Sequence, residues 1–310
     1  MSLYAELSNK KILVTGASGF IGSHLCHRLS ELGTEVHAIS RQKHPIEKNG
    51  PRWWQGDLTE IETVHHLFAT IKPDLIFHLA SYVTGIQDLD YVLPTFRNNL
   101  MSQVHLLIVA SEMGCDRVIF AGSSTEPKPG DSQVSTFSPY VAAKWSASVY
   151  TQMFHLLYQL PIVNLRIHMT YGPAQKDLKK LVPYVILSLL RGEAPKLSNG
   201  LLQADWIYVE DIVEGLLMAS QASKIEGSTI DLGTGTLTSV QTIVEHLVKL
   251  VDPRVEPLFG TLPDRVLETM PVADTEATFA KIGWHAKTPL IEGLNHTIAW
   301  YRQQSHLRGN

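Results

Sequence analysis

Residues 11–22 carry the feature that decides the fold, a short apolar run that leads through three glycines into a helical pattern. The stretch is Lys11-Ile12-Leu13-Val14-Thr15-Gly16-Ala17-Ser18-Gly19-Phe20-Ile21-Gly22. A strand, then Gly-x-x-Gly-x-x-Gly, then a helix is typical of the loop that binds the pyrophosphate of a dinucleotide. Glycine permits the tight turn and the close approach of the backbone, and the helix N-terminus offers unpaired N–H groups to the phosphates. We therefore predict cofactor contacts from Gly16, Ser18, Gly19, Phe20, Ile21 and Gly22.

Strands and helices alternate through the first half of the chain. The sequence predicts strands over 11–15, 35–40, 53–55, 75–79, 118–121 and 162–167, and helices over 21–32, 61–71, 98–113 and 138–160. This alternation indicates a parallel sheet covered by helices on both faces. The fold class expected is α/β, with a Rossmann-type doubly wound parallel sheet whose ligands bind beyond the carboxyl ends of the strands.

The pattern becomes less regular after Tyr171-Gly172-Pro173. The sequence predicts helices over 181–190, 211–222 and 241–251, and strands over 206–209 and 230–233. We expect a dinucleotide-binding domain over residues 1–172. Residues 173–310 should form mainly a smaller α/β substrate-binding lobe, from which segments around 205–235 return to the main sheet.

Composition excludes several classes of protein. A formal net charge of −4 does not indicate the excess of basic residues with which proteins bind nucleic acid. Only Cys26 and Cys115 occur, which favours a reducing compartment over a disulfide framework. The longest apolar stretch, residues 182–190, is too short to span a bilayer, and the start of the chain does not resemble a signal peptide. The 14 His show no ligand spacing. We expect a cytoplasmic protein without metal, membrane or nucleic-acid partner.

Tyr140 and Lys144 lie four residues apart on the predicted helix over 138–160, and Ser123 ends the predicted strand before it. This spacing puts the two side chains on one helix face. Reduction of a carbonyl by hydride needs a proton donor at the oxygen, and a nearby ammonium should lower the Tyr pKa from about 10. Tyr-x-x-x-Lys also occurs by chance, but the preceding glycine loop and Ser-ended strand favour catalysis. The predicted catalytic residues are Ser123, Tyr140 and Lys144.

The end of the second predicted strand bears on the choice of cofactor. It ends in Ser40-Arg41 and has no acid that could bind an unmodified ribose. Arg41 could instead bind a 2′-phosphate, which favours NADP over NAD. The alternative is that Arg41 is a solvated loop residue. Asp57 and Leu58 are predicted to contact the adenine.

Further motifs occur in a fixed order, namely Gly56-Asp57-Leu58, His78-Leu79-Ala80, Asn99, Tyr171-Gly172-Pro173 and Asp205-Trp206-Ile207-Tyr208-Val209-Glu210-Asp211. Together with the glycine loop and Ser123, Tyr140 and Lys144, they resemble the extended short-chain dehydrogenase/reductase superfamily, in its NAD-dependent epimerase/dehydratase branch, over nearly the whole chain.

The resemblance implies a C-terminal domain that binds a nucleotide sugar and a homodimer built through helices around 98–113 and 140–158. It also implies that Tyr140 is the general acid/base and that Lys144 is its partner and binds the ribose. Ser123 would supply the hydroxyl that orients the substrate oxygen, or Ser124 would do so if the strand register differs by one residue. Asn99 resembles the structural Asn of the family's central helix. Leu79, Ala80, Ser81 and Asn99 join the predicted cofactor-binding residues.

The sequence departs from the family's pattern at several positions. Ser124-Thr125 replaces the Asp-Glu of sugar 4,6-dehydratases, so elimination of water is not expected. Met169 and Ala204 replace an Asn and an Arg that usually hold the nucleotide sugar. Glu126 is a possible substrate contact, although a loop Glu is more often solvated. Lys176, Lys179 and Lys180 are candidates for binding a diphosphate, or form a solvated helix face. The predicted substrate-binding residues are Thr84, Ser124, Met169, Lys180 and Arg265.

These observations favour an NADP-dependent oxidoreductase that reduces a nucleotide-linked keto-sugar at C4. A nucleotide-sugar 4-epimerase would use the same three catalytic residues. A reductase of a lipid, phenolic or polyketide carbonyl compound would account for Met169 and Ala204. A non-catalytic dinucleotide sensor is the remaining alternative, and such proteins often lose the Tyr or the Lys.

Overall fold

The structure is a computed structural model, and it describes residues 4–46, 48, 50–128, 138–264 and 270–308. The chain forms two compact units. The first unit comprises Met1–Arg166, Val213–Ile230 and Ala280–Gly283, and the second comprises Ile167–Ile212, Asp231–Phe279 and Trp284–Asn310.

A seven-stranded main sheet has the strand order β3-β2-β1-β4-β5-β6-β9. Its strands are β1 (Lys11–Thr15), β2 (Glu35–Ser40), β3 (Arg52–Gln55), β4 (Leu75–His78), β5 (Arg117–Ser123), β6 (Ile162–Ile167) and β9 (Thr229–Leu232). β1 pairs in parallel with both β2 and β4. The strand order reverses direction between β1 and β4, which is where doubly wound sheets bind nucleotides.

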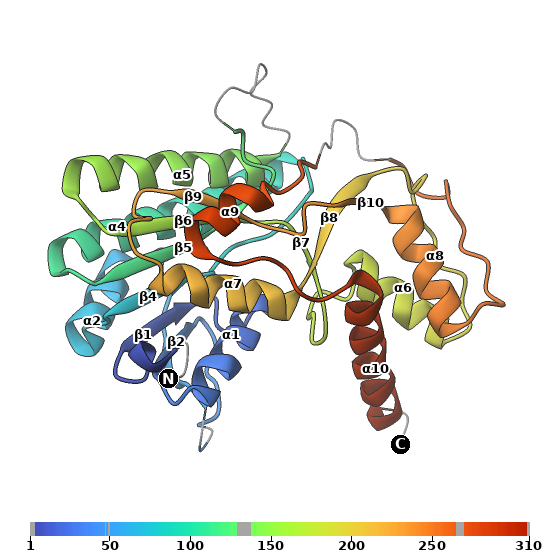
Figure 1. Cartoon of the computed structure of the whole chain (residues 1–310), viewed down its shortest axis with the longest axis horizontal. Coiled ribbons are helices and arrows are strands. Elements are labelled where there is room, and N and C mark those ends of the chain that lie inside the picture. The colour runs from blue at the N-terminus through green and yellow to red at the C-terminus, as the bar shows by residue number, and fades with distance from the viewer. Residues whose placement is uncertain (1–3, 47, 49, 129–137, 265–269, 309–310) are drawn as a thin grey trace. The chain divides into compact units, whose positions relative to one another are not determined.

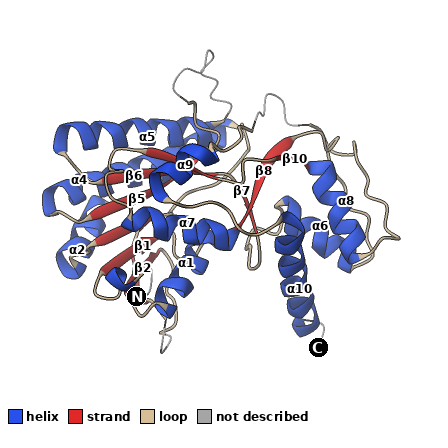
Figure 2. Ribbon diagram, in the orientation of Figure 1, coloured by secondary structure: helices blue, strands red, loops and turns tan. Residues whose placement is uncertain are grey.

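Helices cover both faces of the main sheet (Figure 2). α2 (Ile61–Ile71), α4 (Ser102–Met113) and α5 (Pro139–Tyr158) lie on one face, and α1 (Phe20–Glu31) and α7 (Val209–Gln221) lie on the other (Figure 1). A short 3₁₀ turn, η2 (Leu89–Tyr91), a helical turn, α3 (Val92–Thr95), and a π-helix, η3 (Phe96–Met101), precede α4.

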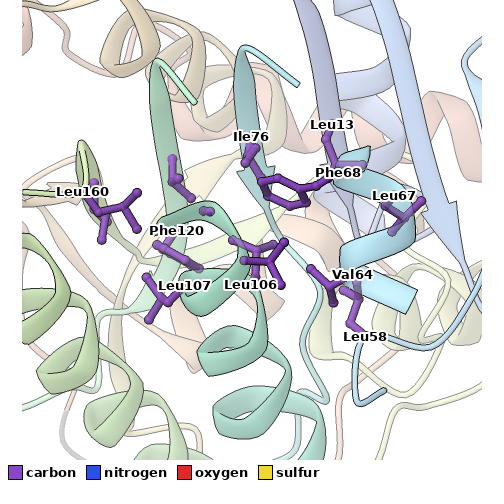
Figure 3. Close-up of a cluster of buried hydrophobic side chains, with 14 of the residues drawn as sticks. Leu13, Leu58, Val64, Leu67, Phe68, Ile76, Leu106, Leu107, Phe120 and Leu160 are labelled. Carbon is purple, nitrogen blue, oxygen red and sulfur yellow. The ribbon is translucent and has the colours of Figure 1, made fainter. Parts of the chain in front are cut away.

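One core cluster of the first unit lies between the sheet and α2 and α4. Leu13, Ile76 and Phe120 point from neighbouring strands toward the helices, where Phe68 and Leu106 meet them (Figure 3). Strands covered on both faces become continuous apolar runs, which explains why each of these segments is recognisable from the sequence. Burying one such side chain stabilises the fold by about 1.5–3 kcal/mol.

The second unit contains a smaller sheet with the strand order β10-β8-β7. Its elements are β7 (Met169–Tyr171), α6 (Leu181–Leu190), β8 (Gln203–Tyr208), β10 (Leu237–Ser239), α8 (Val240–Val251), α9 (Thr275–Ile282) and α10 (Leu290–Arg308), of which α9 ends in the first unit. The strand expected to rejoin the main sheet does so as β9, but β8 pairs with β7 and β10 instead. Within the described residues, no helix combines the length and apolarity needed to cross a membrane.

Candidate active site

The glycine loop between β1 and α1 has the shape of a phosphate cradle. Gly16 has φ +66°, and a Cβ there would lie 2.6 Å from the backbone of Leu79 and Ala80. A Cβ on Gly22 would lie 2.2 Å from the Gly16 carbonyl oxygen. Gly19 is the N-cap of α1 and brings no side chain to its first N–H groups. Bare backbone at a helix N-terminus fits the pyrophosphate of a dinucleotide.

Thr15 and His78 join the carboxyl ends of β1 and β4, where they pair in register. Thr15 Oγ1 lies 2.9 Å from His78 Nδ1 and accepts a hydrogen bond from Ala80 N at 3.2 Å. These contacts hold Leu79 and Ala80 beside Gly16. Burial, with a smaller effect of the Lys144 ammonium, lowers the pKa of His78 to about 3, so His78 is neutral at ordinary pH.

The end of β2 places Ser40 and Arg41 near the glycine loop. The hydroxyl oxygens of Ser40 and Ser18 are 3.5 Å apart, and Arg41 Nη1 donates to Asn98 Oδ1 at 3.4 Å. The carboxylate of Asp57 accepts a hydrogen bond from Thr59 N at 2.9 Å. Leu58 is buried in the core cluster of Figure 3. Adenine contacts from Asp57 and Leu58 stay a prediction.

Asn99 lies in the π-helix η3 and is buried. Its Oδ1 accepts hydrogen bonds from Tyr82 N at 2.6 Å and Ser81 Oγ at 3.1 Å, and its Nδ2 donates to Tyr82 O at 3.1 Å. π-helices are rare and often occur at functional sites. Asn99 therefore fixes the segment after β4, and through it Ser81, beside the predicted catalytic residues.

Ser123, Tyr140 and Lys144 come together at the ends of β5 and α5. Ser138 begins α5 by accepting a hydrogen bond from Val141 N at 3.3 Å, which sets the first turn containing Tyr140. The Tyr140 hydroxyl shares hydrogen bonds with Ser123 and Ser81. Lys144 is buried, and its Nζ donates to Ala121 O at 2.6 Å.

The charges at this site differ from the expectation that Lys144 lowers the pKa of Tyr140. Burial raises the pKa of Tyr140 to about 12, and the Glu126 carboxylate contributes in the same direction. Burial also lowers the pKa of Lys144 to about 8. The expectation was wrong because it took account of the ammonium alone and not of burial or a second charge.

Glu126 is the residue whose environment differs most from what the sequence suggests. It is neither solvated nor placed to contact substrate, because its side chain is 4% exposed. Ser123 N and the Ser148 hydroxyl both donate to its carboxylate. No periodicity or motif marks Glu126, Ser148 or Asn164, which lie far apart in sequence and meet only in the folded chain.

The predicted substrate-binding residues belong to both units. In the first unit, Ser124 is buried, and Thr84 Oγ1 accepts a hydrogen bond from Ile86 N at 3.1 Å. In the second unit, Met169 begins β7 and Lys180 immediately precedes α6. Arg265 lies outside the described residues. A substrate role stays a prediction for all five.

The two Asp residues of the segment from Asp205 to Asp211 bind backbone within the second unit. Asp205 accepts hydrogen bonds from Thr234 N at 2.7 Å and Gly235 N at 2.9 Å. Asp211 accepts hydrogen bonds from Lys287 N and Thr288 N at 3.1 and 3.0 Å. Both carboxylates fix loops by satisfying N–H groups. Across the described chain, no cluster of three or more His, Cys, Asp or Glu could hold a metal ion.

Comparison with known proteins places this geometry in context. A profile of the NAD dependent epimerase/dehydratase family matches residues 12–233. A trifunctional UDP-glucose 4,6-dehydratase/UDP-4-keto-6-deoxy-D-glucose 3,5-epimerase/UDP-4-keto-L-rhamnose-reductase of Arabidopsis thaliana is 26% identical, and the match covers 99% of this chain but only 49% of that protein. A UDP-glucose 4-epimerase of Mycolicibacterium smegmatis is 28% identical over 95% of this chain and 99% of that protein.

Solved structures show the same likeness. The structure of MoeE5 in complex with UDP-glucuronic acid and NAD superposes with a TM-score of 0.83 at 28% identity, and the match covers 95% of this chain and 99% of that chain.

Proposed function

Because the chain belongs to the NAD-dependent epimerase/dehydratase family, we propose that it is an oxidoreductase of nucleotide sugars that reduces a keto-sugar at C4. The observation that carries the proposal is the hydrogen-bonded group of Ser123 and Tyr140 beside Lys144. Sugar 4,6-dehydratases of the epimerase/dehydratase branch have Asp and Glu at the positions of Ser124 and Thr125, which supply no carboxylate. The site therefore has the groups for proton transfer at a carbonyl oxygen and lacks that pair for eliminating water.

Each side chain has a role in this reaction. A nicotinamide cofactor supplies the hydride when it is bound. Tyr140, with a pKa raised to about 12, is protonated at neutral pH and can donate its proton to the carbonyl oxygen. The Ser123 hydroxyl, which already shares a hydrogen bond with Tyr140, can hold the same oxygen. Lys144 is proposed to bind the ribose. Its ammonium is also proposed to stabilise the phenolate that forms on Tyr140 as the proton leaves.

NAD is the cofactor named for the family, and we further propose that this chain prefers NADP. Support comes from the end of β2, where Ser40 and Arg41 replace the acid that would bind an unmodified ribose. The Arg41 guanidinium brings positive charge and several donors, which suit a 2′-phosphate.

A nucleotide-sugar 4-epimerase is the second candidate. It is favoured by the similarity to the Mycolicibacterium smegmatis UDP-glucose 4-epimerase over 95% of this chain. Such an enzyme would use Tyr140 first as base and then as acid, with the keto intermediate rotating between the two hydride transfers. With a pKa raised to about 12, Tyr140 is protonated at neutral pH, whereas an epimerase would first need it deprotonated.

We also propose that the chain forms a homodimer through the helices around residues 98–113 and 140–158. α5 leaves Val149 and Tyr150 exposed at 52% and 41%, and Phe96 in η3 is 46% exposed. Trp145 and Ser146 line a shallow pocket together with Val149 and Tyr150. Large apolar side chains gathered on one surface favour burial against another chain.

Mass spectrometry of products from a panel of nucleotide sugars and 4-keto-sugars tests the reaction. Each substrate is incubated with NADPH, with NADH and with neither. A product two hydrogens heavier that forms fastest with NADPH is the expected result. An isomer of unchanged mass, separated from the substrate by liquid chromatography and formed without added reduced cofactor, would instead establish the epimerase. No product from any nucleotide-linked member would reject both and direct attention to other carbonyl compounds.

A further inference from the structure

The carboxyl group of Glu126 is buried among polar groups close to Ser123, Tyr140 and Lys144. Ser123 N donates to Glu126 Oε1 at 2.5 Å, and the Ser148 hydroxyl donates to Oε2. Asn164 Nδ2 in turn donates to Ser148 Oγ at 2.9 Å. Both oxygens accept hydrogen bonds, as a charged carboxylate requires.

Gly122 indicates that this arrangement is a specific feature of the chain. A Cβ at position 122 would lie 2.8 Å from Glu126 Oε1 and 2.8 Å from Asn164 Oδ1. Gly122 does not have the positive φ that would otherwise explain a glycine. A side chain at position 122 would therefore displace the Glu126 carboxyl group or the Asn164 amide group.

The position of Glu126 makes it unsuited to direct catalysis. Its side chain is 4% exposed, and both oxygens are occupied by Ser123 and Ser148, so a substrate proton cannot reach it. Glu126 instead contacts the backbone N–H of Ser123, and the hydroxyl of Ser123 binds Tyr140. A change in Glu126 would thus act through Ser123 and through charge.

Several charged groups face this carboxylate. The pKa of Glu126 is raised, because burial outweighs the hydrogen bonds from Ser148 and Ser123 and the positive charges of Lys144 on α5 and Arg166 on β6, which lower it. The Glu126 charge acts in turn on Lys144, whose ammonium it favours, and on Tyr140, whose phenolate it opposes. His78 on β4 is neutral and adds no charge.

We propose that Glu126 is a positioning residue that fixes Ser123 through its backbone N–H and opposes the negative charge that Tyr140 would carry as a base. The proposal rests on the catalytic assignment above and deepens it, because it accounts for Tyr140 acting as proton donor in a reduction. In a chain with this carboxylate, Tyr140 should stay protonated to higher pH than in the same chain without it.

Deprotonation of Tyr140 can be measured without substrate. Stopped-flow pH jumps record phenolate absorbance at the start of each trace, before alkaline unfolding proceeds. The Tyr140 signal is the difference between each protein and its Tyr140→Phe counterpart. Glu126→Gln, which removes the charge but keeps the shape, should move the midpoint down by about one pH unit, a tenfold increase in the acid dissociation constant.

Two further variants separate charge from structure. Glu126→Asp keeps the charge and should leave the midpoint closer to that of the unmodified chain than Glu126→Gln does. Glu214→Gln removes a carboxylate that instead binds Tyr4 and Arg28, and should leave the midpoint unchanged. Equal midpoints in the unmodified and Glu126→Gln chains would overturn the proposal. An equal shift in Glu214→Gln would also overturn it, because the effect would then not be local.

The titration and the product panel can fail independently. A shifted midpoint with no product from the panel would keep the role of Glu126 and reject the nucleotide-sugar assignment. A reduced product with an unshifted midpoint would keep the assignment and reject the role of Glu126. If Glu126→Gln does not fold, as judged by circular dichroism, Glu126→Ala replaces it. This variant also removes the charge and should move the midpoint in the same direction.

Discussion

Tyr140 shows how burial and a single buried charge alter the properties of a residue that sequence alone would assign. The Tyr-x-x-x-Lys spacing predicts a Tyr made acidic by its Lys, yet the pKa of Tyr140 is raised to about 12. Lys144 directs its ammonium to Ala121 O, and its own pKa falls to about 8 through burial. Tyr140 is therefore protonated at neutral pH, the form in which it can donate a proton to a carbonyl oxygen.

The catalytic assignment of Tyr140 is tested by Tyr140→Phe. Loss of the hydroxyl should reduce turnover by about 10²–10⁴-fold, because general acid catalysis contributes by that factor. Cofactor binding, measured by isothermal titration calorimetry, should stay nearly unchanged because the glycine loop is untouched. Tyr150→Phe on the same helix, at a residue 41% exposed, is the matched control and should keep full turnover. Full turnover in Tyr140→Phe would remove the assignment.

The elements around the glycine loop depend on close backbone contact. β1, β4 and α1 meet at Gly16, where Leu79 and Ala80 leave no room for a side chain. The helix predicted over 98–113 illustrates a different effect of context. Its first turns form the π-helix η3 instead of regular α-helix, and Asn99 in this segment binds Ser81 and Tyr82.

Gly16→Ala and Gly33→Ala form a matched pair at this scale. Both glycines have positive φ, +66° and +73°, so alanine at either position costs about 1–2 kcal/mol of backbone strain. Only at Gly16 would the new Cβ also meet backbone, at 2.6 Å, whereas nothing lies within 4 Å at Gly33. Chemical denaturation should show a larger loss of stability for Gly16→Ala, and only this variant should lose cofactor binding. Equal losses in both variants would contradict the close packing.

At the scale of the whole molecule, the chain has two compact units and an apolar surface on the first. The proposed homodimer predicts a mass in analytical ultracentrifugation of twice the 34.5 kDa of one chain. Phe96→Glu and Val149→Glu together should shift the protein to monomer, because two charges would have to be buried in the interface.

A control for this prediction lies in the second unit. Leu201 is 68% exposed, and Leu201→Glu should leave the mass unchanged. A monomer in the unmodified chain at micromolar concentration would contradict the dimer. Dissociation by Leu201→Glu alone would move the interface away from α5.

The sequence by itself determined the α/β class, the main strands and helices, and the motifs that led to the family. Each of these is a local property of the sequence. Apolar segments reveal buried strands, and Gly16, Gly19 and Gly22 lie close together in one short stretch. Ser123, Tyr140 and Lys144 were also predicted together, because Ser123 ends a predicted strand and the four-residue spacing places Tyr140 and Lys144 on one helix face.

Only the tertiary structure decided the rest. β7 and β10 are too short for periodicity to reveal them, and their pairing with β8 depends on residues far apart in sequence. The environment of Glu126 depends on Ser148 and Asn164, which come from α5 and β6. Because a carboxylate's charge, exposure and partners are set by long-range packing, no local pattern could distinguish a solvated loop Glu from one buried beside Tyr140.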